Sequence, residues 1–235
     1  MSRSVVIDCF PEHVERYADG WAVVAVDVIR ATTTAITAVD LGHPCYPVPT
    51  LEVAVALSAR LDNPLLIGEL GGKVPYGFDL GNSPADVSLL TERSRPLILL
   101  STSGTRLMCN ATSSDAAYVA CLRNLSGQVA YLAGRHDRIA VVGAGARGEF
   151  REEDQLCCAW LAEGLCGHGY APADEQTAEI VQRWHGASVD AINQGASARY
   201  LRETAQMHDL DFVVHHVDDI DGAFAVVDEQ VVRVS

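Results

Sequence analysis

The sequence predicts a layered α/β/α fold whose largely parallel or mixed sheet carries an antiparallel edge at its C-terminal end. Short β-branched runs alternate with stretches in which apolar residues recur every three or four positions. Such alternation is typical of α/β folds with parallel strands. Near the C-terminus the apolar runs stand too close together for crossover helices, which favours antiparallel pairing there.

The expected strands are buried runs bounded by Gly, Pro or charged residues, at Val5–Ile7, Ala22–Ile29, Leu65–Ile67, Leu97–Leu100 and Ile139–Val142. The expected helices lie at Thr32–Leu41, Leu51–Leu61, Pro84–Arg93, Gly104–Thr112 and Glu152–Leu165. Asn82 and Ser83 favour a helix start, because a capping side chain there precedes proline at the first helical position. In the tail we expect helices near Asp174–Trp184 and Ala196–His208 and strands at Phe212–Val214, Ala223–Val227 and Val231–Val234.

Length and composition set the broad class. The 235 residues are 49% apolar and 20% charged, as in ordinary globular proteins. We expect one domain over residues 1–235, with two lobes that divide near 165–175 as the alternative.

A formal net charge of −14 argues against non-specific nucleic-acid binding. No signal peptide or membrane span is recognisable, so the expected location is the cytoplasm. The seven cysteines are scattered and contain no C-x-x-C pair, so we do not expect a disulfide framework.

The first candidate segment is a strand end with a carboxylate and an arginine, followed by a threonine-rich helix start. Asp27 and Arg30 stand there, with Thr33 in the first helical turn. Ligands of open α/β sheets bind beyond the carboxyl ends of the strands, where helix N-termini offer N–H groups to phosphate. Asp27 could hold a metal and Arg30 a phosphate; the alternative is an Asp–Arg pair that caps the helix.

The second candidate segment is the long glycine-rich loop at 68–84, which carries Glu69, Asp79, Asn82 and Ser83. Its carboxylates, amide and hydroxyl are a suitable set of hard oxygen ligands for Mg²⁺. Glycines let the backbone approach a ligand closely. The alternative is a loop of tight turns, with an Asx turn at Asp79 and a helix cap at Ser83.

The third candidate segment again joins a strand end to a helix start, and its polar residues are Ser101, Thr102, Ser103, Gly104 and Thr105. Hydroxyl and amide groups at the positive end of a helix dipole form a cradle for a small anion. The alternative is simple N-capping.

The fourth candidate segment, Gly143–Gly148, matches G-x-G-x-x-G after a strand and so raises a dinucleotide-binding alternative. The next helix is expected to begin only near Glu152, and no strand with an acidic end follows about 20 residues on. Arg147 as a phosphate or leaving-group clamp, with Glu153 or Asp154 near a metal, suits a phosphatase better.

With these four segments the chain resembles the 2-phosphosulfolactate phosphatase family. The matching segments are Asp27–Thr34 and Gly77–Pro84, nearly letter for letter, then Ser101–Thr105, and Arg147 with Glu152–Asp154. The resemblance covers roughly Val5 to Leu165. It implies Mg²⁺-dependent hydrolysis of a phosphomonoester to an alcohol and phosphate, with 2-phospho-3-sulfolactate as the named substrate, on the route to coenzyme M.

Three positions depart from the pattern that the resemblance implies: Leu70, where the family usually has Arg after the loop glutamate; Ser103, where it usually has Asn; and Gly143, where Cys is frequent. The change at Leu70 bears on substrate identity, because it removes a basic side chain beside the expected substrate.

The resemblance also suggests roles for the candidate residues. The expected metal ligands are Asp27, Glu69, Asp79 and Asp154. Arg30 and Arg147 would hold the phosphate, and Glu153 or Asp154 would position a water or protonate the leaving oxygen. The nucleophile is either a metal-polarised water or Asp27 itself.

Two alternatives of function stay open: a nucleotide- or anion-binding protein without catalysis, and a homologue that acts on a different phosphomonoester such as a nucleoside-type phosphate. The expected partners are a small anionic phosphomonoester, no nucleic acid and no membrane, with a homodimer as an option.

Overall fold

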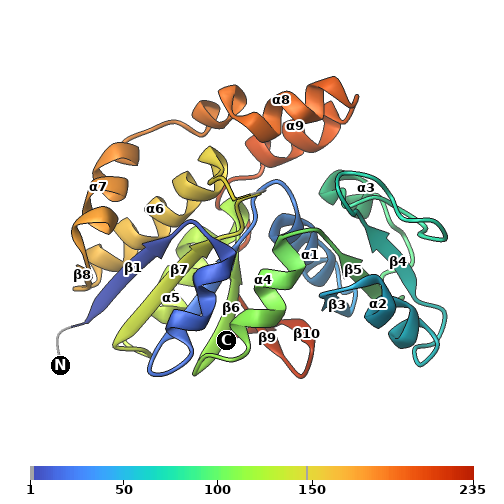
Figure 1. Cartoon of the computed structure of the whole chain (residues 1–235), viewed down its shortest axis with the longest axis horizontal. Helices are drawn as coiled ribbons and strands as arrows, with labels where there is room; N and C mark the ends of the chain where they lie inside the picture. The colour runs from blue at the N-terminus through green and yellow to red at the C-terminus, as the bar shows by residue number, and fades with distance from the viewer. Residues whose placement is uncertain (1–2, 147) are drawn as a thin grey trace.

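The computed structural model describes residues 3–146 and 148–235. Within them, ten strands form one mixed sheet in the order β4-β5-β3-β10-β9-β6-β2-β7-β1-β8 (Figure 1). The strands are β1 Ser4–Asp8, β2 Ala22–Val26, β3 Cys45–Val48, β4 Leu65–Gly68, β5 Leu97–Leu100, β6 Ala116–Ala120, β7 Arg138–Gly143, β8 Ala171–Pro172, β9 Ala223–Val227 and β10 Gln230–Val234.

The helices connect these strands and cover both faces of the sheet. The α-helices are α1 Ala31–Asp40, α2 Leu51–Ser58, α3 Pro84–Ser88, α4 Gly104–Ala111, α5 Leu125–Leu132, α6 Glu152–Gly167, α7 Glu175–Trp184, α8 Ala196–Glu203 and α9 Met207–His215. Short 3₁₀ helices lie at η1 Pro11–Tyr17, η2 Leu122–Asn124 and η3 Val189–Gln194. None of the helices described is long and apolar enough to cross a membrane.

The side chains of the central strands pack alternately into two separate apolar cores, one on each face of the sheet. Successive residues of a strand point to opposite faces. Val23 and Ala25 of β2 pack on the face that α1 and α4 cover. Val24 and Val26 pack on the opposite face, under α5, α6 and α7. The layered α/β prediction is thereby confirmed.

The C-terminal strands pair antiparallel, as expected, but they lie inside the sheet rather than at its edge, where they join two parallel blocks. β9 pairs with β6 at the edge of the block β6-β2-β7-β1-β8, and β10 pairs with β3 at the edge of the block β4-β5-β3. The hairpin contact with β3 is a single residue pair, Val231 with Cys45. The sheet is thus continuous but weakly joined at this line.

Several elements differ from the sequence prediction. Phe212–Val214, expected as a strand, lies inside α9, where the buried residues Asp209, Leu210 and Val213 follow helical spacing. β3 and β6 were not predicted; β3 contains Pro47, and the Ala-rich β6 lacks a β-branched run. β2 ends at Val26, three residues earlier than expected, which leaves Asp27 at its carboxyl end. The expectation of one domain, with a division near 165–175 as the alternative, stays a prediction.

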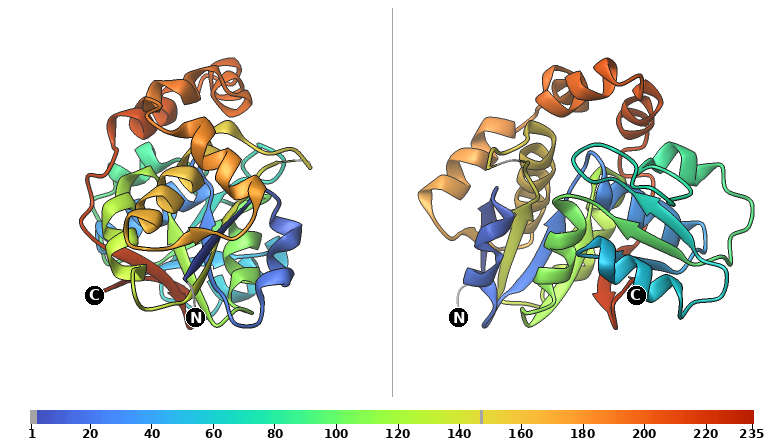
Figure 2. Two further views of the ribbon diagram at one scale, coloured as in Figure 1. Left: turned by 90° about the vertical axis from the view of Figure 1, so that its left-hand side faces the viewer. Right: turned by 45° about the vertical axis from the view of Figure 1, so that its right-hand side comes forward.

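Helices α8 and α9, residues 196–215, are called the cap here. They pack on each other through a small core of Ala198, Leu201 and Leu210, and they lie over the carboxyl ends of the central strands (Figure 2). The cap therefore closes the end of the sheet where ligands of α/β proteins bind.

Candidate active site

Asp27 lies at the centre of the site because of how β2 ends. All five residues of β2 are buried, and the Thr32 hydroxyl donates to the Asp27 carbonyl and accepts from its backbone N–H at 2.8 and 2.9 Å. This turn aims the Asp27 side chain at the start of α4. A Cβ atom at Gly104 would lie 2.0 Å from Asp27 Oδ2, so only glycine at 104 admits the carboxylate in this position.

The helices that start around Asp27 are α1, α4, α6 and α8, and in none of them does the side chain of the N-cap residue accept a hydrogen bond. By contrast α2, α3 and α7 have side-chain caps from Thr50, Ser83 and Asp174. The first N–H groups of a helix need an acceptor, and an uncapped start favours an anion. The four uncapped helix starts all contribute residues to one pocket.

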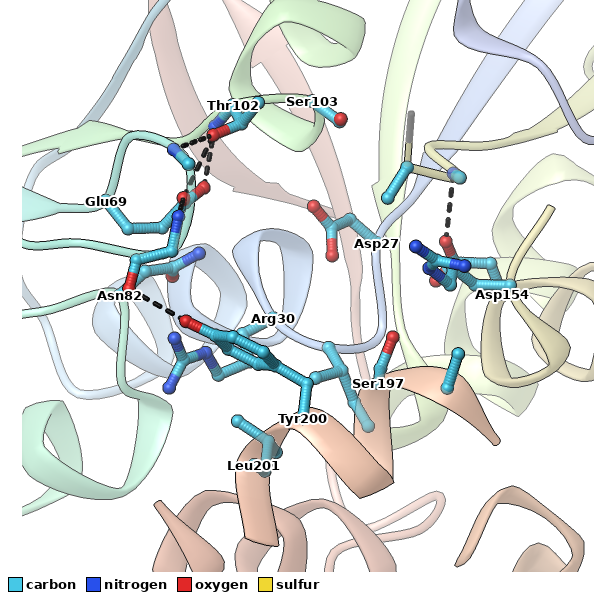
Figure 3. Close-up of a pocket in the computed structure, with 17 residues that line it drawn as sticks. Asp27, Arg30, Glu69, Asn82, Thr102, Ser103, Asp154, Ser197, Tyr200 and Leu201 are labelled. Atoms are coloured by element: carbon cyan, nitrogen blue, oxygen red, sulfur yellow. Dashed lines mark hydrogen bonds between the residues drawn. The ribbon is translucent and has the colours of Figure 1, made fainter. Parts of the chain in front are cut away.

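This pocket is a cavity of about 330 Å³ at the carboxyl ends of the strands, beneath the cap. Its lining residues are Asp27, Ile29, Arg30, Glu69, Gly71, Gly72, Asn82, Thr102, Ser103, Gly145, Ala146, Arg151, Asp154, Ala196, Ser197, Tyr200 and Leu201. Figure 3 shows Asp27 between Glu69 on one side and Asp154 on the other, with Ser197 and Tyr200 of the cap facing them. A cavity of this size suits a small ligand.

Two of the pocket carboxylates are held by hydrogen bonds. Glu69 accepts from the backbone N–H groups of Thr102 and Gly72, both at 2.7 Å, and from the Thr102 hydroxyl at 2.9 Å. Asp154 accepts from the N–H groups of Val28 at 2.8 Å and Gly145 at 3.2 Å. These bonds fix both carboxylates and tie together loops that follow β4, β5, β2 and β7.

Negative charge accumulates beside Asp27. Burial raises the pKa of Asp27 to about 7, and the nearby carboxylates of Glu69 and Glu153 contribute in the same direction. Burial also raises the pKa of Asp154, again with help from Asp27 and Glu153. A buried group of acids with raised pKa values is typical of a functional site, and a bound cation would relieve the repulsion.

Arg30 is positioned by the cap. Its Nη1 donates to Asp209 Oδ2 at 2.5 Å and to the Gln206 side chain. Asp209 is completely buried and also accepts from the Ser83 hydroxyl at 2.6 Å and from the Ala85 N–H at 3.3 Å. One carboxylate of α9 thus joins the first and second candidate segments. A second contact from the cap runs from the Tyr200 hydroxyl to the Gly72 carbonyl at 2.8 Å.

Seven of the predicted site residues line the pocket: Asp27, Arg30, Glu69, Asn82, Thr102, Ser103 and Asp154. Gly104 lies directly behind Asp27. Asn82 is 3% exposed, and its Oδ1 has no hydrogen-bond partner among the described residues. A buried, unpartnered polar atom that faces a pocket indicates a ligand.

Asp79 lies outside the pocket. The residue is exposed, and its Oδ2 accepts from the Leu66 N–H of β4 at 2.8 Å. This bond joins the loop to the edge strand; it spans 13 positions and is not the Asx turn named as the alternative. Glu153 also lies outside the lining, 1% exposed, with Ser197 beside it and no hydrogen-bond partner for either oxygen among the described residues. Arg147 lies outside the described residues.

The remaining predicted residues have local structural bonds. Thr33 donates to the Val28 carbonyl. Ser101 and Thr105 bond to each other across the start of α4, and Ser83 caps α3. None of the four lines the pocket. For Ser83, Ser101 and Thr105 the bonds are those of the capping alternative, whereas Thr33 holds the turn between β2 and α1.

The sequence analysis missed Arg151, Ser197, Tyr200 and Asp209. For two of them, Arg151 and Asp209, the sequence does contain an unusual feature. Arg151 stands at the N-cap of α6, where Ser, Thr, Asn or Asp is usual. Asp209 is a carboxylate on the apolar stripe of α9. The tail carried no motif that would have placed Ser197 or Tyr200 over the pocket. Leu70, in contrast, does not line it.

The glycine loop after β7 does not have the arrangement of a dinucleotide fingerprint. Helix α6 begins at Glu152, nine residues after the strand ends at Gly143, and the Gly145 N–H already donates to Asp154. In a dinucleotide site the helix follows the loop directly and the loop N–H groups face the pyrophosphate.

The fold and the pocket together define a layered α/β protein with a small polar pocket beyond its strand ends, an arrangement that suits a small anionic ligand. A family model described as 2-phosphosulpholactate phosphatase matches residues 9–222. The chain belongs to the 2-phosphosulfolactate phosphatase family, whose name describes phosphoric monoester hydrolases.

Individual relatives agree with the family match. A protein of Synechococcus sp. strain JA-2-3B'a(2-13) is 31% identical over 228 residues, which is 94% of this chain and 93% of the relative. One of Symbiobacterium thermophilum is 30% identical over 202 residues, 82% of this chain and 86% of the relative. One of Pseudothermotoga lettingae is 40% identical over 134 residues, which is 57% of this chain and 58% of the relative. All three are named "Probable 2-phosphosulfolactate phosphatase".

Proposed function

We propose that this protein is a Mg²⁺-dependent phosphatase that hydrolyses a small acidic phosphomonoester, 2-phosphosulfolactate or a related compound. The observation that carries the proposal is the convergence of uncapped helix starts on Asp27 within one small pocket. The family and the names of its relatives supply the reaction class. Helix N–H groups suit the phosphate oxygens, and the acids beside them suit a divalent cation.

The donor set is compatible with Mg²⁺. Among the described residues, no three His, Cys, Asp or Glu side chains form a complete protein cage for a metal. Mg²⁺ usually keeps several waters and binds one or two carboxylates together with substrate phosphate, so it does not need such a cage. Asp27 would hold the ion, and Glu69 and Asp154 would add negative charge around it. When bound, the ion would neutralise the phosphate and polarise a water.

Binding of the phosphoryl group is proposed for the chain's own donors. The proposed donors to the phosphate oxygens are the N–H groups of Ser103 and Gly104 at the start of α4 and those at the start of α8, near Ser197. The N–H groups of Thr102 and Thr105 already donate to Glu69 and Ser101. Asp209 and Gln206 accept from Nη1 of Arg30, which leaves the N–H groups of its Nη2 and Nε as further donors for the phosphate. Donors that are fixed before the substrate arrives favour the charge distribution of the transition state.

The proposed reaction consumes one water and cleaves the phosphorus–oxygen bond of the ester. The water oxygen becomes part of the phosphate, and the leaving alkoxide takes up a proton to give the alcohol. The route of attack has two alternatives, direct attack by water or attack by Asp27 with an aspartyl-phosphate intermediate. A chiral, isotopically labelled phosphate separates them, because one displacement inverts the configuration at phosphorus and two displacements retain it.

Release of phosphate from 2-phospho-3-sulfolactate, with and without EDTA, tests the function. EDTA should abolish release and added Mg²⁺ should restore it. Asp27→Asn should remove nearly all turnover, whereas the matched variant Asp79→Asn, in an exposed residue outside the pocket, should keep it. Binding of the ester without turnover by the Mg²⁺-loaded wild type would instead identify a binding protein. Equal loss in both variants would contradict the assignment of the pocket.

A further inference from the structure

The two arginines in the described lining of the pocket, Arg30 and Arg151, differ in how well their positive charge is paired with a carboxylate. Arg30 forms an ion pair with the fully buried Asp209. Arg151 has Glu149 as its ion-pair partner among the described residues, at 3.3 Å, and the Glu149 side chain is 76% exposed. An exposed carboxylate is well solvated and pairs weakly. The charge of Arg151 is therefore the less compensated of the two.

Arg151 is nevertheless held close to the pocket. It is the N-cap residue of α6, its side chain is 16% exposed, and it lines the cavity together with Ala196 and Ser197 of the cap. Burial raises the pKa of the neighbouring Glu153, and the charge of Arg151 opposes that rise, but no ion pair or hydrogen bond joins the two among the described residues. A largely buried guanidinium without a directly paired buried carboxylate is unfavourable in the free protein. A ligand anion would compensate it. Its planar donor fork fits a carboxylate or another oxyanion with two parallel hydrogen bonds.

We propose that Arg151 binds a second anionic group of the substrate, a carboxylate or sulfonate on the carbon chain, while the phosphoryl group lies at Asp27 and the start of α4. This inference rests on the proposed function and assigns the residue that sets its substrate class. Leu70 lies outside the lining, so position 70 does not supply this contact. The protein then selects phosphomonoesters that carry a further acid.

Three secondary phosphate esters test the assignment: 2-phospho-3-sulfolactate, 2-phospholactate and 2-propyl phosphate. Arg151→Met should lower kcat/KM for the acidic esters roughly ten- to a hundredfold, because a charge-assisted contact is lost, and should lower it less than about threefold for 2-propyl phosphate. Arg151→Lys keeps the charge but lacks the planar donor fork, so its kcat/KM for the acidic esters should lie between those of the wild type and of Arg151→Met. Arg199→Met, an exposed arginine of α8 outside the lining, is the matched control and should change none of the three.

The pattern of losses identifies the group that Arg151 binds. A loss for both acidic esters indicates the carboxylate, and a loss for 2-phospho-3-sulfolactate alone indicates the sulfonate; each supports the proposal. An equal loss for all three esters, or none, overturns it. If the wild type hydrolyses no ester, the proposed function fails, and calorimetric binding of 3-sulfolactate then tests Arg151 by itself. Unchanged affinity in Arg151→Met would overturn the inference in that case too.

Discussion

Replacing Asp209 by alanine should destabilise the protein strongly. The change leaves the Arg30 guanidinium buried without its counter-ion and removes the acceptor of the Ser83 hydroxyl. Because both partners of the ion pair are nearly or completely buried, the loss should be about 3–5 kcal/mol. For a chain of this size, such a loss lowers the melting temperature by about 6–20 °C.

Urea denaturation and thermal melting of Asp209→Ala measure this loss. The matched variant is Asp211→Ala on the same helix, where the side chain is exposed, and it should change the unfolding free energy by less than about 0.5 kcal/mol. If both variants melt together, Asp209 does not stabilise the structure through the ion pair. Phosphatase activity of Asp209→Ala below its melting temperature should also fall, since Arg30 loses its fixed position.

Further variants probe the site around Asp27. Gly104→Ala should lower kcat by about a hundredfold, because a Cβ would lie 2.0 Å from Asp27 Oδ2 and a displacement of 1 Å has that effect; normal turnover would contradict this geometry. The raised pKa of Asp27, about 7 because of burial, implies that the metal-free folded state binds more protons than the unfolded state, whose Asp titrates near pH ~3.9. The unfolding free energy should then fall between pH ~4 and ~7, and Asp27→Asn should flatten that slope in urea titrations; an unchanged slope would refute the assignment. Arg30→Lys should reduce kcat/KM at least about tenfold, since an ammonium lacks the planar fork; full activity would make Arg30 a purely structural residue. Tyr200→Phe should cost about 1 kcal/mol of stability through the lost bond to Gly72, and urea midpoints equal to wild type would show that this contact is dispensable.

Most of the pocket residues that follow directly after a strand could be predicted from the sequence. Asp27, Glu69, Thr102 and Ser103 could be found because each follows a buried strand, and the carboxyl ends of parallel strands meet at one edge of a sheet. Asp79 could not be separated from them, because a loop carboxylate that bonds to a neighbouring strand has the same sequence pattern as one that faces a ligand.

The contribution of the cap could not be predicted, because it depends on contacts between distant parts of the chain. Asp209 meets Arg30 across 179 positions and Ser83 across 126. The polar spacing of α8 is that of a solvated helix, and only the packed structure places Ser197 and Tyr200 over the pocket. The same limit applied to β3 and β6, whose pairing partners β10 and β9 come last among the strands.

The order of the strands has a consequence for synthesis of the chain. β9 and β10 leave the ribosome after every other strand, yet they pair with the edges of both parallel blocks. Until residues 223–234 have emerged, β3 and β6 each present a free row of backbone donors and acceptors. Free strand edges of this kind pair readily with other chains. We therefore expect aggregation of nascent or truncated chains to begin at β3 and β6, and the hairpin to act as the element that ends this exposure.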